Sequence, residues 1–180
     1  GINHFDFPDR KALLRRSRKI APRLAGLKRR ARRNSVPVIC VNDNFGEWHS
    51  DASKLMAICL RPEMRGRVFV EAICPDESDY FVLKPMHSAF YQTPLDLLLR
   101  HLNVNTLILT GLATNNRILC TAHEAKMREF EIIVAHDCCT ANSQREHNQA
   151  LMHLEHVVEA RVRASASIDF NELKTSRSST

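Results

Sequence analysis

The first candidate catalytic or binding residues lie at a tight turn in the middle of the chain. An apolar strand is predicted over 106–110, Gly111 follows it, and a helix begins at about Asn116. Backbone N–H groups at a helix start have no partner within the helix and can hold an oxyanion. The residues of this candidate oxyanion turn are Leu112, Ala113 and Thr114.

Two cations are predicted beside that turn. Arg117 falls in the first helical turn, where its permanently charged guanidinium could bind a carboxylate or phosphate. Lys84 ends the predicted strand 80–84 and precedes Pro85, which places it at the same edge of a sheet. Neighbouring cations need a counter-charge, so we expect an upstream acid or a bound anion. Alternatively, Lys84 extends to solvent and Arg117 fills the pocket without a ligand.

One thiol and five possible substrate-lining residues complete the set of candidate site residues. Cys120 follows Arg117 by three residues and shares its helix face, as a displaced nucleophile would. A buried core thiol is the favoured interpretation of Cys120. Substrate-lining residues are expected at the pocket ends, although the aromatic ones could equally close a dimer interface. These residues are Phe5, Asn44, Phe45, Trp48 and Phe90.

Strand-like and helix-like runs alternate along the chain, and they must position these side chains. Strands are predicted over 36–41, 80–84, 106–110, 131–135 and 162–166, and helices over 10–33, 52–60, 95–102, 116–130 and 143–160. This alternation predicts an α/β fold of three layers, with a doubly wound and mostly parallel sheet. We expect a single domain over 1–170 and a polar tail over 171–180.

The first helix has no strand before it. Residues 1–9 have the character of a loop, whereas the alternation calls for a strand at the centre of the sheet before residue 10. We therefore expect the central strand to lie upstream of Gly1.

Composition excludes several classes of protein. The 180 residues are 44% hydrophobic, enough for one domain with a substantial core. No apolar run approaches the roughly 18 residues that span a bilayer, so no membrane segment is expected. The charged first twenty residues do not form a signal-peptide pattern. The six scattered cysteines predict reduced thiols and a cytoplasmic protein.

The net charge of +6 is unevenly placed. Residues 10–33 contain twelve Lys or Arg residues and no acid, so this helix could bind nucleic acid or a membrane surface. No aromatic residue lies among them to stack on bases. A solvated helix face is the favoured interpretation, and nucleic-acid binding is not expected.

Several motifs in order resemble the isochorismatase-like cysteine hydrolase superfamily, which includes nicotinamidases. Asn3-His4-Phe5 resembles the end of its opening motif, and Lys84-Pro85 with Ser88-Ala89-Phe90 resembles its lysine motif. Gly111–Thr114 before a helix resembles its nucleophile turn. His136-Asp137-Cys138 resembles its last strand region. The resemblance covers the chain from Ile2 to about Ile168.

The resemblance implies a site of aspartate, lysine and cysteine that attacks a carbonyl through a thiolate. Only Lys84 has a match, because Arg117 stands at the cysteine position and the aspartate would precede Gly1. The nicotinamidase branch binds a metal through a close Asp-x-His, whereas Asp43 and His49 are six residues apart. We predict no metal and no cofactor. The family also implies a homo-oligomer.

The function predicted from this resemblance is hydrolysis of a small molecule, either an amide or an enol ether such as isochorismate. Arg117 at the nucleophile position argues against thiol catalysis and for binding of a substrate carboxylate. A second hypothesis is an inactive pseudoenzyme or binding protein that holds an anion between Lys84 and Arg117. A nucleic-acid or membrane-surface adaptor is the third and weakest. Whether the chain is an enzyme stays open at this point.

Overall fold

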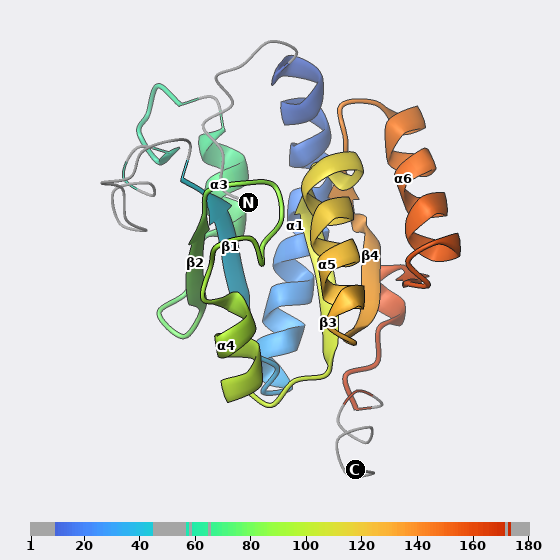
Figure 1. The fold of residues 1–180 in the computed structure, drawn as a ribbon. Helices are drawn as coiled ribbons and strands as arrows, with labels where there is room; N and C mark the ends of the chain where they lie inside the picture. The colour runs from blue at the N-terminus through green and yellow to red at the C-terminus, as the bar shows by residue number, and fades with distance from the viewer. Residues whose placement is uncertain (1–9, 45–56, 58, 65, 172, 174–180) are drawn as a thin grey trace.

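A computed structural model describes residues 10–44, 57, 59–64, 66–171 and 173. The elements follow one another as helix and strand in alternation (Figure 1). In chain order they are α1 (Arg10–Arg33), β1 (Ile39–Asp43), α3 (Arg67–Ile73), β2 (Tyr80–Lys84), α4 (Leu95–His101), β3 (Thr106–Leu112), η1 (Thr114–Ile118), α5 (Leu119–Met127), β4 (Glu131–Thr140), α6 (Gln144–His156), β5 (Arg161–Arg163) and η2 (Ser165–Ser167).

Every strand pairing in the described chain is parallel, which confirms the predicted α/β class. β1 pairs with β2, and β3, β4 and β5 form a second sheet in that order. Helices α1 and α3 pack on one face, while α4, α5 and α6 pack on the other (Figure 1). The three-layer arrangement follows because strands buried on both faces require helices on both.

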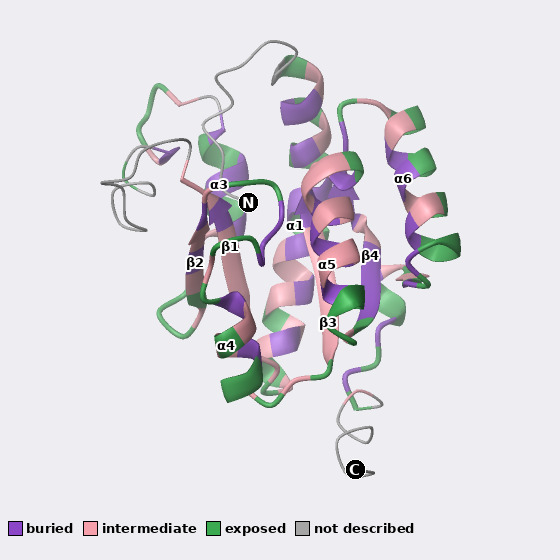
Figure 2. Ribbon diagram, in the orientation of Figure 1, coloured by how far each residue is buried: buried purple, intermediate pink, exposed green. Residues whose placement is uncertain are grey.

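The buried apolar residues form two cores, one on each face of the sheets, and β4 contributes side chains to both. Ile133 and Ala135 face the core that contains α1, and Ile132 and Val134 face the core that contains α5. Successive side chains of a strand point to opposite faces, so one apolar run serves both layers. Figure 2 shows β4 as largely buried.

A cleft separates β1 from β3. The strands that were predicted to form one sheet thus lie in two sheets within the described chain. Both strands are apolar along most of their length, yet most of their residues are only half-buried (Figure 2). The side chains and backbones of β1 and β3 line this cleft.

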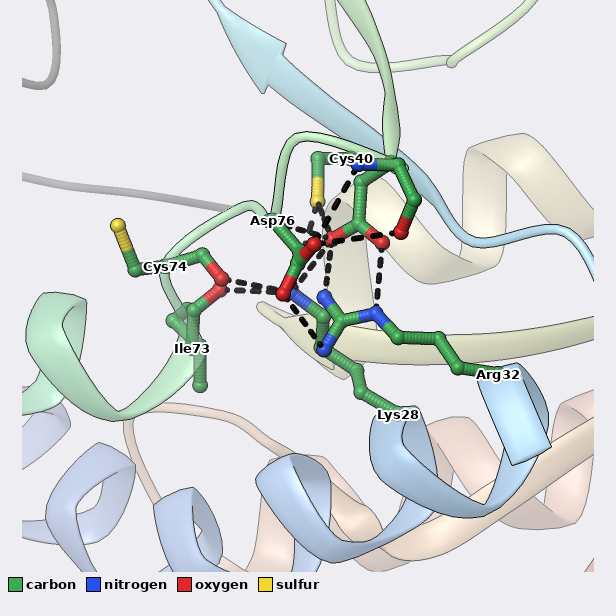
Figure 3. A network of polar contacts seen from close by, with 8 residues as sticks. Lys28, Arg32, Cys40, Ile73, Cys74 and Asp76 are labelled. Carbon is green, nitrogen blue, oxygen red and sulfur yellow. Dashed lines mark hydrogen bonds and ion pairs between the residues drawn. The ribbon is translucent and has the colours of Figure 1, made fainter.

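α1 is joined to the β1–β2 sheet by a buried ion network at the amino end of β2 (Figure 3). The Asp79 side chain is only 1% exposed and accepts from Arg32 through both oxygens, at 3.0 and 2.6 Å. Lys28 Nζ lies 3.1 Å from Asp79 and donates to the carbonyls of Ile73 and Cys74, each at 3.0 Å. Lys28 therefore also neutralises the carboxyl end of α3.

Other basic residues of α1 bind the C-terminal part of the described chain. Arg30 donates to the carbonyls of Ser165 (2.8 Å) and Ile168 (2.6 Å), and its guanidinium lies 5.3 Å from the Phe170 ring centroid. Arg23 lies 3.8 Å from Asp137. Part of the basic character of α1 thus serves internal contacts, which accounts for these charges without a nucleic acid.

Some element bounds differ from the prediction. β1 runs through Asp43, which the sequence pattern had placed in a loop, because β1 pairs in register with β2 up to Lys84. β5 ends at Arg163, since Ser165–Ser167 forms a 3₁₀ turn. Helix α3 was not predicted, because seven residues hold too few turns to show a period. Most of the helix predicted over 52–60 lies outside the described residues, as does nearly all of the 171–180 tail.

None of the helices in the described chain is long and apolar enough to cross a membrane.

Replacing Asp79 with Asn should lower the free energy of unfolding by about 3 kcal/mol, because two cations lose their buried partner. Burial would raise the pKa of Asp79, but the hydrogen bond from Arg32 and further contacts hold it below its usual value. The contribution is therefore present above the ordinary Asp pKa of about 3.9 and is lost as pH falls through the lower folded value. Urea titration at pH 7 and at pH 3 measures both effects.

The matched control is Asp76→Asn, since the Asp76 side chain is 56% exposed and lies 3.8 Å from Arg32. That change should stay within about 0.5 kcal/mol. Equal losses in the two variants would contradict a structural role for Asp79.

Candidate active site

The candidate site lies where β1 and β2 end. Asp43 and Lys84 are partners in the parallel register, so the last residues of the two strands stand side by side. Lys84 is 4% exposed, and its ammonium donates to Asp43 Oδ1 and to the carbonyl of Met86 at 2.5 Å. Lys84 is therefore directed into the site and not out to solvent.

Arg117 reaches the same carboxylate from the other sheet. It lies in η1, a wide helical turn that follows β3 and leads into α5. Its Nε donates to Asp43 Oδ2 at 2.6 Å, and its Nη2 lies 2.5 Å from that oxygen. Asp43 thus bridges the two cations and the two sheets. The counter-charge expected from an upstream acid or a bound anion is supplied by Asp43, which the sequence pattern had raised only as a metal ligand.

The charges of this cluster are set by burial and by the contacts within it. Burial alone would raise the pKa of Asp43, but the hydrogen bonds from Arg117 and Lys84 outweigh it and lower that pKa. Burial lowers the pKa of Lys84 despite the nearby carboxylate, and the charge of Arg117 adds to the decrease. With both cations protonated, the cluster carries one net positive charge. It is therefore suited to a small anion.

The turn before Arg117 is anchored from α6. Thr114 is fully buried, and its hydroxyl lies 2.9 Å from His147 Nδ1. Burial lowers the pKa of His147, and the nearby His136 and Arg16 lower it further, which favours the neutral ring. Helix α6 is fixed at its start by a capping box of Ser143 and Glu146. His147 was not among the predicted site residues, because a single histidine in a helix carries no pattern.

Three of the other predicted site residues lie near the cluster or line the cleft, and three lie outside the described residues. Cys120 is half-buried on α5 and close enough to Lys84 to interact with its charge. Phe90 is buried, lines the cleft and lies 6.0 Å from Phe130 between ring centroids. The Asn44 N–H donates to the Lys84 carbonyl at 3.0 Å. Phe5, Phe45 and Trp48 lie outside the described residues.

Two further thiols lie near the carboxyl end of β4 but are poor nucleophiles. Burial is the main cause that raises the pKa of Cys138 to about 11 and that of Cys139 to about 12. Both thiols therefore stay protonated at neutral pH. Among the described residues, no three His, Cys, Asp or Glu side chains are placed to hold a metal ion.

The comparisons with known proteins agree with this architecture. The family model described as Isochorismatase domain matches residues 6–166. The chain is 38% identical over 167 residues to YaaI of Bacillus subtilis, an uncharacterized isochorismatase family protein, covering 93% of this chain and 91% of YaaI. It is 39% identical over 100 residues to the ureidoacrylate amidohydrolase RutB of Methylorubrum extorquens, covering 50% of this chain and 40% of RutB.

A solved structure supports the same conclusion. N-carbamoylsarcosine amidase from Thermoplasma acidophilum superposes with a TM-score of 0.67 and 27% identity, covering 86% of this chain and 87% of that one. The chain therefore belongs to the isochorismatase-like hydrolase superfamily.

Replacing Asp43 with Asn should lower the free energy of unfolding by about 3 kcal/mol, because Lys84 and Arg117 would face each other without a counter-charge. Sulfate should restore part of the loss in this variant and less in the parent. Urea unfolding with and without sulfate at constant ionic strength measures the effect. The control Glu71→Gln removes an exposed partner of Arg67 and should change little. A loss no larger than that of the control would contradict the bridging role of Asp43.

Proposed function

We propose that the chain hydrolyses a small amide or enol ether that carries a carboxylate, without a covalent thiol intermediate at position 117. The observation that carries this proposal is the Lys84–Asp43–Arg117 cluster, with its single net positive charge at the carboxyl ends of the strands. The planar guanidinium of Arg117 suits bidentate binding of a carboxylate. Its side chain is about one-third exposed, at 32%, so a ligand can reach it.

The names of two relatives support this class of substrate. RutB acts on ureidoacrylate, and the Thermoplasma enzyme acts on N-carbamoylsarcosine. Both compounds combine an amide-like carbonyl with a carboxylate. A cationic residue at the family's nucleophile position is consistent with recognition of the substrate carboxylate.

For an amide, the residues of the site would act as follows. Arg117 and Lys84 hold the carboxylate, and the N–H groups at the start of η1 face the oxygen of the reacting carbonyl. A water molecule attacks the carbonyl carbon and gives its proton to Asp43. The tetrahedral intermediate then collapses, and the proton passes to the departing nitrogen. For an enol ether, the vinyl carbon takes a proton, and Lys84 is a candidate donor because burial lowers its pKa. A water molecule then adds to the oxocarbenium carbon and returns a proton to the Lys84 amine. The hemiketal that forms breaks its C–O bond and releases the carbonyl product and the alcohol.

A second candidate function is anion binding without hydrolysis. Both oxygens of Asp43 accept from cations, and the pKa of this carboxyl is held below its usual range. A carboxylate with a low pKa is a weak general base at neutral pH. This observation favours a binding protein that uses the same cluster.

Replacing Arg117 with Gln should weaken binding of ureidoacrylate and N-carbamoylsarcosine at least about tenfold, since a charge-assisted pair contributes about 1.5–3 kcal/mol. Calorimetry measures binding, ammonia release measures hydrolysis, and intact mass reports any acyl-enzyme. The control Arg100→Gln removes a surface cation that pairs with Asp96 on the same helix, and this variant should bind normally. Binding with ammonia release supports the hydrolase, and binding without it supports the second candidate. Unchanged binding in Arg117→Gln would contradict both.

Restoring a thiol at the nucleophile position is a separate test. In Arg117→Cys the introduced thiol lies near Lys84, whose charge lowers a thiol pKa. At pH 7 it should react with iodoacetamide roughly tenfold faster than the thiol of Asn115→Cys, which is exposed in the same turn. Peptide mapping separates these thiols from the six native ones. Equal rates would mean that position 117 does not face the lysine.

A further inference from the structure

Two histidines meet between α5 and α6, outside the Lys84–Asp43–Arg117 cluster. His123 lies on α5 and His153 on α6, and the two helices pack side by side on one face of β4 (Figure 1). The ring Nε2 atoms are 2.8 Å apart, and the ring centroids are 5.0 Å apart with the ring planes tilted by 56°. Ring nitrogens from two different helices are therefore directed at each other.

The short distance between the two Nε2 atoms fixes how protons are placed on the rings. The nitrogens share one hydrogen bond, so one Nε2 carries a proton and the other accepts it with its lone pair. No hydrogen bond joins either Nδ1 to another described residue. The donor ring can thus exchange its Nε2 proton for one on Nδ1 through solvent without losing a further contact. Two Nε2 lone pairs would then face each other, an arrangement that calls for a bound cation.

Imidazole lone pairs held in this way are ligands for late transition metals. Zn²⁺ binds histidine nitrogens at about 2.0–2.1 Å in tetrahedral geometry, which sets two such nitrogens about 3.3 Å apart. The two Nε2 atoms, at 2.8 Å, need to separate by only about 0.5 Å to reach that spacing. Both rings are half-buried, so an ion can arrive from solvent and retain water in its other positions.

The helix pair is held in place by contacts that do not involve the histidines. Ala122 and Ala125 of α5 and Leu154 of α6 are fully buried. Lys126 donates to Glu159 at 2.5 Å and ties the end of α5 to the segment that follows α6. The two imidazoles are thus presented by a preformed scaffold, which lowers the entropic cost of binding an ion between them.

We propose that His123 and His153 form a site for one divalent late transition metal ion, such as Zn²⁺, bound through both Nε2 atoms. The described residues supply no third His, Cys, Asp or Glu ligand, so the ion would be exchangeable and would complete its coordination with water. It would join the two helical segments that also meet through Thr114 and His147, and it would stabilise the folded chain. The site does not depend on the proposed hydrolysis.

The first test follows the imidazole nitrogens of the metal-free protein by NMR as Zn²⁺ is added, with the thiols kept reduced. The Nε2 signals of His123 and His153 should shift together and saturate at one ion per chain. Those of His156 serve as an internal reference and should not move. His156 is exposed on α6, and its Nδ1 lies 2.8 Å from the Met152 carbonyl.

The second test uses variants of the pair. Replacing either His123 or His153 with Gln should weaken Zn²⁺ binding at least about tenfold, because the loss of even an outer-shell partner of a metal ligand has an effect of that size. The matched control His156→Gln should bind Zn²⁺ as the parent does. Zn²⁺ should also raise the Tm of the parent and of this control more than the Tm of the two pair variants.

Three outcomes would overturn the proposal. One is that neither Nε2 signal shifts with Zn²⁺ at up to about 1 mM, the range of weak binding, which would leave the pair as a structural hydrogen bond. This result comes from the unsubstituted protein and does not depend on whether a variant folds. Another is a shift of only one of the two signals. The third is Zn²⁺ binding that is unchanged in both pair variants or equally weakened in His156→Gln, which would assign the ion to thiols or to surface histidines in general.

Discussion

The Asp43 carboxylate is the contact on which the candidate site and the join between the two sheets both depend. One oxygen accepts from Lys84 in the adjacent strand, and the other accepts from Arg117 beyond the cleft. Without it, two cations would meet in a largely buried position, at a high electrostatic cost. The same ion pairs that hold the sheets together therefore fix the charge of the site.

α1 performs the corresponding role at the opposite end. Lys28 and Arg32 bind the buried Asp79 before β2, while Arg30 binds the segment after β5. One helix is thereby attached to both halves of the molecule through charged side chains, and its apolar face fills the core between them. A helix so rich in Lys and Arg is in this way part of the interior and not only a solvated surface.

The resemblance to the family implies that this chain departs from the usual motif at Arg117. The sequence motifs imply a thiolate at this turn in hydrolases of the superfamily and align Arg117, which Asp43 holds, with that position. The turn itself is retained, with Thr114 buried and bound to His147. A buried turn followed by a cationic side chain is an arrangement that suits an anionic group.

Local patterns were enough to determine the α/β class, the helix over Arg10–Arg33 and the strand over Tyr80–Lys84, because apolar periodicity and proline positions are properties of short segments. The motifs around Lys84 and Gly111 likewise indicated the candidate site from sequence alone. The role of Asp43 required the tertiary structure, since only the parallel register sets it beside Lys84, and only the packing of η1 brings Arg117 to it from 74 residues away. The same holds for His147, whose contact with Thr114 joins two helical segments 33 residues apart. Contacts between distant residues leave no local periodicity, so the sequence determined the elements and the fold decided which side chains share a site.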